Sequence, residues 1–124
     1  MVSADKIDFA TIGDFSYSTS EVATNSKWID GETIYRKVIN LGALPNATNK
    51  DIPIGIAMST VVNARIIASD GAITQVVPYA TATSLAAQVG FAIYGTNTTS
   101  SSITVFSGTN RSGLTGWLIL EYTK

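Results

Sequence analysis

The sequence predicts an all-β domain, an antiparallel β-sandwich of jelly-roll or Greek-key type with about seven or eight strands. Apolar residues alternate with a period of two along most of the chain, and no long window has helical spacing. Clusters of Ser, Thr, Asn and Gly interrupt this alternation at intervals of roughly ten residues, as is typical of sandwiches and barrels. The 124 residues, 45% of them hydrophobic, fit one globular domain.

Residues 1–20 contain isolated apolar side chains and no long alternating run. We therefore predict a domain boundary near Ser20, with residues 1–20 acting as a connector or as a strand added to a neighbouring subunit, and residues 21–124 forming the sandwich. The first strong hairpin signal is Asp30-Gly31 between apolar runs, for which we expect a type I′ turn.

The next strands follow from alternation and turn chemistry. The even-numbered residues from Val62 to Ala68 are apolar and predict one face of a strand, and Asp70-Gly71 predicts a second hairpin before a strand at 73–79. The clearest strand spans 85–93, where the odd-numbered residues are apolar. The small residues Ala86, Gly90 and Ala92 between them would suit close packing near a symmetry axis. Further strands are predicted at 103–106 and 114–123.

The last strand is apolar on both faces. Leu118, Leu120 and Tyr122 point to one side, and Trp117 and Ile119 point to the other. A strand of this kind is covered on both sides. Because a two-layer domain supplies one cover, a partner subunit is expected to supply the second. The sequence therefore predicts a homo-oligomer.

Composition excludes several classes of function. The chain has no Cys and no His, so thiol chemistry, Ser-His-Asp triads and the common transition-metal sites are excluded. We predict no enzyme activity, no cofactor and no metal. The net charge of −1 with scattered basic residues argues against a nucleic-acid partner. No signal-peptide pattern opens the chain, and no apolar run is long enough for a membrane span.

Six short blocks, in this order, resemble the C-terminal tip domains of tailed-bacteriophage tail fibres. Together they frame the chain from residue 17 to residue 124. The blocks are Tyr17–Val22, Trp28–Gly31, Ile34–Val38, Gly42–Asn46, Asn110–Gly113 and Leu120–Lys124.

This resemblance implies a homotrimeric sandwich knob at the distal end of a virion fibre, where it binds a host cell-surface receptor, most simply a glycan. Three such sites on one rigid tip would act together through avidity. Two alternatives stay open at this point: a capsid-decorating or head-fibre knob with a purely structural role, and a lectin-like surface module without a virion context.

Receptor sites on sandwiches usually lie in end loops, where side chains are exposed. The candidate loops are 79–84, 94–102 and 107–112, which offer Tyr79, Tyr94, Asn97, Asn110 and Arg111 as ligand-binding residues. Aromatic faces with amide and guanidinium donors suit a sugar ring. A glycan depolymerase would instead need a pair of carboxyl groups. Asp30 and Glu32 are the nearest such pair, and we expect them to serve the turn.

Overall fold

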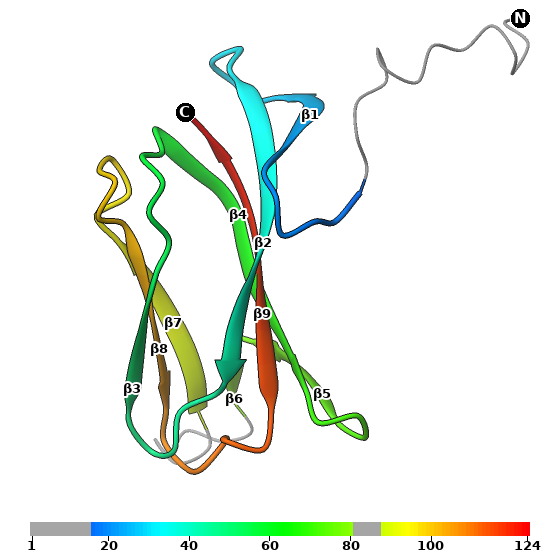
Figure 1. Ribbon diagram of the computed structural model, residues 1–124, viewed down its shortest axis with the longest axis vertical. Helices are drawn as coiled ribbons and strands as arrows, with labels where there is room; N and C mark the ends of the chain where they lie inside the picture. Colours follow the sequence, from blue (N-terminus) through cyan, green and yellow to red (C-terminus); the bar gives the residue numbers. More distant parts are fainter. Residues whose placement is uncertain (1–15, 81–87) are drawn as a thin grey trace, which may run out of the picture.

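The protein folds as two β-sheets packed face to face, as the computed structural model shows (Figure 1). The structure describes residues 16–80 and 88–124, without the side chains of Tyr79 and Ala80. In these ranges all regular elements are strands, and the predicted all-β sandwich is confirmed. None of the described residues forms a helix that could cross a lipid bilayer.

The described residues form eight strands of four or more residues and one of two residues. They are β1 (Val22–Lys27), β2 (Thr33–Ala43), β3 (Asn49–Pro53), β4 (Thr60–Ser69), β5 (Thr74–Val77), β6 (Tyr79–Ala80), β7 (Gln88–Tyr94), β8 (Ser102–Ser107) and β9 (Thr115–Thr123). One sheet has the order β1-β2-β9-β4-β5, and the other has the order β3-β8-β7-β6. All neighbouring strands are antiparallel.

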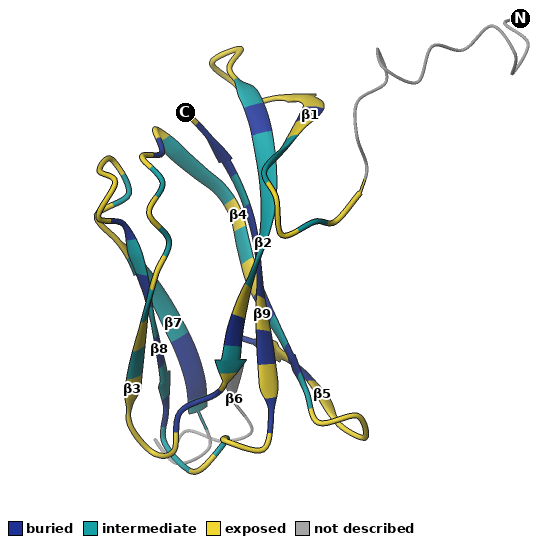
Figure 2. Ribbon diagram, viewed as in Figure 1, coloured by how far each residue is buried: buried dark blue, intermediate teal, exposed yellow. Residues whose placement is uncertain are grey.

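Alternation within β9 decides where the core lies. Leu118, Leu120 and Tyr122 are fully buried and belong to the hydrophobic cluster between the sheets (Figure 2). From the opposite sheet, Ile103 and Val105 of β8 join the same cluster. These residues face inward because side chains alternate along a strand. The outward residues of β9 therefore lie on the outer surface of the five-stranded sheet.

The turn between β1 and β2 differs from the predicted type I′ turn. Gly31 has a φ of +86°, whereas Asp30 has no positive φ. The amide of Gly31 donates to the carbonyl of Trp28 at 2.9 Å, and the amide of Trp28 donates to the carbonyl of Glu32 at 2.9 Å. This is a three-residue hairpin loop in which one glycine takes the left-handed conformation. The hairpin was predicted correctly, but its turn type was wrong.

A β-bulge also shifts the expected face of β4. Val61 pairs with Tyr122 and Asn63 pairs with Glu121, so Val62 is the extra residue between them. The sequence placed Val62 on the same face as Ile66, but Val61, and not Val62, packs against the core cluster with Ile66. A bulge inserts one residue and reverses the alternation on one side of it.

Gly90 of β7 is small for a reason within its own chain. A Cβ atom at Gly90 would lie 2.5 Å from Cε1 of Phe106, its partner in β8. The Phe106 ring therefore covers Gly90 on the outside of the four-stranded sheet, and a packing role against the same subunit explains the glycine. Ala86, the third residue expected near an axis, lies outside the described residues.

The strand directions sort the loops into two ends of the sandwich (Figure 1). One end carries the β1–β2, β3–β4 and β7–β8 loops together with the end of β9. The other end carries the β2–β3, β4–β5 and β8–β9 loops. We call the second group the β4–β5 end, because the candidate site lies there.

Candidate functional site

The predicted ligand-binding residues do not form one site. Tyr94 pairs with Ser102, whereas Ser107 pairs with Val89 at the far end of the same two strands. Tyr94 and the following Asn97 therefore lie at one end of the sandwich. Asn110 and Arg111 follow Ser107 and lie at the β4–β5 end. Tyr79 begins β6 at that same end, but its side chain lies outside the described residues.

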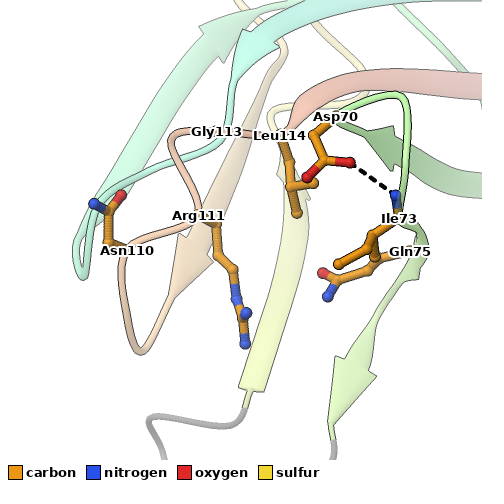
Figure 3. A pocket seen from close by; sticks show the side chains of 7 residues that line it. All are labelled: Asp70, Ile73, Gln75, Asn110, Arg111, Gly113 and Leu114. Carbon is orange, nitrogen blue, oxygen red and sulfur yellow. Dashed lines mark hydrogen bonds between the residues drawn. The ribbon is translucent and has the colours of Figure 1, made fainter.

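A cavity of about 220 Å³ opens at the β4–β5 end, between the β4–β5 hairpin and the β8–β9 loop (Figure 3). Two of the five predicted residues line it, from the loop side. The described lining residues are Asp70, Ile73, Gln75, Asn110, Arg111, Gly113 and Leu114. The site therefore combines two segments that are far apart in the sequence.

Backbone hydrogen bonds fix the β8–β9 loop. The amide of Arg111 donates to the carbonyl of Pro45 at 3.1 Å, which ties the loop to the segment after β2. The side-chain oxygen of Asn110 accepts from the amide of Ser112 at 2.9 Å and from its hydroxyl at 2.7 Å. Asn110 thus shapes the loop, as Asn often does in turns. The half-buried Arg111 side chain extends from the loop beside the cavity (Figure 3).

The opposite wall is the hairpin predicted from Asp70-Gly71. Oδ1 of Asp70 accepts from the amides of Ala72 at 2.9 Å and Ile73 at 2.7 Å. These backbone donors lower the pKa of the Asp70 carboxyl from its ordinary value, because they favour the charged form. Ile73 presents an apolar side chain that is 57% exposed on the same wall. This wall therefore offers an anion next to an apolar surface.

Gln75 is the most informative residue of the cavity. It is 9% exposed, and its Oε1 atom is buried without a hydrogen-bond partner in the described structure. A buried polar atom without a partner costs stability, so such atoms are rare in native proteins. The Gln75 side chain lies between Ile73 and Arg111 at the cavity (Figure 3). A ligand hydroxyl would supply the missing donor.

The chemistry of the site suits a hydroxyl-rich ligand. Gln75 provides an acceptor, Arg111 provides donors in a planar fork, and Asp70 provides a charged acceptor on the rim. Ile73 gives the apolar contact that the face of a sugar ring requires. Asp70 is the one carboxyl group among the described lining residues.

Sequence reasoning missed Asp70 and Gln75. Asp70 was assigned to the turn, which is correct, but the turn also forms a wall of the cavity. Gln75 could have been found from its position, because it is two residues before the buried Val77 in an alternating strand. A polar residue at an inward position of a strand is a signal of its own.

Two other depressions on the described surface differ from this cavity in their polar groups. One, of about 180 Å³, includes Asn97 and Lys124 at the opposite end, and one, of about 270 Å³, lies beside β2 near Lys37 and Pro53. Neither is lined by a buried polar atom without a partner. In the described part of the chain, no three acidic side chains come together as a metal site would need.

The chain matches no protein-family model, no curated protein and no solved structure. The resemblance to phage fibre tips therefore stays a prediction from the sequence blocks.

Proposed function

We propose that this protein is the distal receptor-binding domain of a bacteriophage tail fibre, a homotrimeric knob that binds a glycan of the host cell surface through the cavity at the β4–β5 end. The observation that carries the proposal is Gln75, a buried acceptor without a partner in a cavity that also contains Arg111 and Asp70. A sugar hydroxyl is the simplest group that completes this site.

The path of the chain supports the β4–β5 end as the distal one. The carbonyl of Ser16 accepts from Arg36 at 3.3 Å, and the carbonyl of Ser18 accepts from the amide of Val38 at 2.9 Å. Residues 16–18 thus run in the same direction as β2, which ends at the β4–β5 end. Residue 16 therefore lies nearer to the other end of the sandwich than residue 18 does. A shaft attached there leaves the cavity at the free tip of the fibre.

The strand connections support the finer description of the knob. The connections from β3 to β4 and from β8 to β9 both pass from one sheet to the other, and β9 inserts between β2 and β4. A hairpin such as β4–β5 that stays within one sheet, combined with connections that cross to the other sheet, is typical of the Greek-key form.

The positions of the carboxyl groups favour a protein that binds a glycan without cleaving it. Glycoside hydrolysis needs two carboxyl groups on either side of the bond. The cavity has Asp70, which is exposed and already accepts two backbone amides. Asp30 and Glu32 lie exposed in the β1–β2 turn, where Oδ1 of Asp30 accepts from the amide of Glu32 at 2.9 Å. They serve the turn, as expected, and line none of the depressions described above.

The experiment is glycan binding by purified protein on an array of bacterial surface polysaccharides. The variant is Arg111→Ala, with Tyr94→Ala as the matched control at the opposite end, where the side chain is 58% exposed. A hydrogen bond to a charged group contributes about 1.5–3 kcal/mol, so Arg111→Ala should weaken binding by about 10- to 100-fold. Tyr94→Ala should bind as the wild type does.

Three other results would contradict the proposal. Equal binding by Arg111→Ala and the wild type would exclude this cavity. Weaker binding by Tyr94→Ala would move the site to the opposite end. A wild-type trimer that binds no polysaccharide on the array, and no intact bacteria, would favour the structural knob of a head fibre.

A further inference from the structure

The outer face of the five-stranded sheet carries an apolar surface that the described part of the chain leaves partly exposed. It consists of Val38, Ile67, Val76, Trp117 and Ile119, and we call it the outer patch. Val76 is 55% exposed and Trp117 is 39% exposed, whereas Ile119 is 8% exposed among its neighbours. The core cluster contains Leu118, Leu120 and Tyr122 but neither Trp117 nor Ile119, so the expected outward direction of these two residues is confirmed.

The strand register makes the outer patch continuous. Ile67 of β4 pairs with Val76 on one side and with Trp117 on the other, so these three side chains form a row across β5, β4 and β9. Ile119 pairs with Val38 of β2 on one side and with the exposed Arg65 of β4 on the other, so the next row is apolar on β2 and β9 and charged on β4. Side chains directly opposite each other on antiparallel strands lie in contact range. The outer patch therefore spans four of the five strands.

The outer face of the four-stranded sheet is different. Asp51 and Thr104 face each other there and are joined by a hydrogen bond of 2.5 Å. Asn49 is exposed beside them, and Phe106 is half-buried over Gly90. This face is suited to solvent. The outer patch is the larger group of aliphatic side chains on the two outer faces, and exposed apolar patches often mark interaction sites.

The chain enters the domain beside the outer patch. Arg36 points to the outer face, because it pairs with Glu121 and its guanidinium lies 3.3 Å from the Glu121 carboxylate. The Tyr17 ring lies 4.9 Å from that guanidinium, and Ser18 is hydrogen-bonded to Val38 of the patch. The connector from residue 16 onward therefore lies on the same face as the outer patch.

We propose that the outer patch is the interface between copies of this chain, and that in the trimer the five-stranded sheets face the three-fold axis. This inference rests on the proposed function, because a fibre brings three connectors together into one shaft. The face that carries the connector must then turn toward the axis, and the outer patch turns with it. A second copy is thus the occupant that the position of residues 16–18 favours.

Charge placed on the outer patch tests this directly. Val76→Lys is the variant, because Val76 is more than half exposed on an edge strand and its side chain points away from the core. Asn49→Lys is the control, with the same charge on the edge strand of the other sheet. We expect sedimentation to give the mass of three chains for the wild type and for Asn49→Lys, and of one chain for Val76→Lys. Circular dichroism and the urea midpoint report whether each variant is folded.

The outcomes separate this inference from the proposed function. A folded Val76→Lys that stays trimeric overturns the interface, even if the wild type binds glycan. A folded Val76→Lys monomer supports the interface whether or not the wild type binds glycan. If the wild type binds no glycan, that result contradicts the proposed function and leaves the interface supported. A wild-type monomer also overturns the interface.

Discussion

Replacement of Gln75 by Met should stabilise the fold while it weakens ligand binding. Met has a similar length and a weakly polar thioether in place of the amide, so it removes the buried amide oxygen without creating a large cavity. A buried polar group without a partner costs about 1–3 kcal/mol, and the variant should recover part of this. We expect about 1 kcal/mol more stability.

The measurement is urea unfolding followed by tryptophan fluorescence, with the midpoint compared between the wild type and Gln75→Met. Thr74→Met is the matched control, because Thr74 is exposed on the same strand and has its side chain on the other face. Exposed substitutions of this kind usually change stability by less than about 0.5 kcal/mol. Polysaccharide binding by the same proteins gives the second readout.

Two results would refute the reasoning about Gln75. A lower midpoint for Gln75→Met would mean that its amide makes a stabilising interaction in the folded protein. A higher midpoint with unchanged glycan binding would mean that the acceptor is buried for a reason other than the ligand. If Gln75 is kept for ligand binding at a cost to stability, Gln75→Met should raise the free energy of unfolding and also weaken glycan binding.

Two further predictions concern the fold itself. Leu120→Ala should lower the free energy of unfolding by about 2–5 kcal/mol, because Leu120 is fully buried in a central strand, whereas Ile73→Ala on the surface should change the urea midpoint little. A small effect of Leu120→Ala would contradict the assigned core. Backbone donors lower the pKa of Asp70 in the fold below its ordinary value of 3.8, so its charge stabilises the protein above that value, and this contribution is lost as the pH falls through the lowered pKa. Asp70→Asn should therefore show a smaller loss of stability than the wild type between about pH 5 and about pH 1, and parallel urea curves across that range would contradict it.

The sequence predicted the elements of the fold better than their details. Alternation identified β7 and β9, and Asp70-Gly71 marked the β4–β5 hairpin, because both signals are local. The bulge at Val62 was missed because one extra residue leaves the apolar composition of a strand unchanged. The turn at Asp30-Gly31 was assigned the wrong type because the same dipeptide fits a three-residue loop.

The candidate site was less predictable, because it depends on which loops meet. Asn110 and Arg111 were correctly placed in an end loop, but their separation from Tyr94 and Asn97 follows from the direction of β7 and β8. Without the strand pairing, all three loops looked equivalent. Gln75 carried a local signal in its inward position, and it was overlooked because a single polar residue interrupts an otherwise apolar row.

The central position of β9 has a consequence for biosynthesis. Strands β2 and β4 leave the ribosome early, yet each of them pairs with β9, the last strand of the described chain. The larger sheet is therefore split into two hairpins until β9 has been synthesised, and apolar side chains of both hairpins are exposed until then. Long-range pairing of this kind is slow to form and prone to aggregation. Nascent and prematurely terminated products of this gene should therefore depend on chaperones or be degraded.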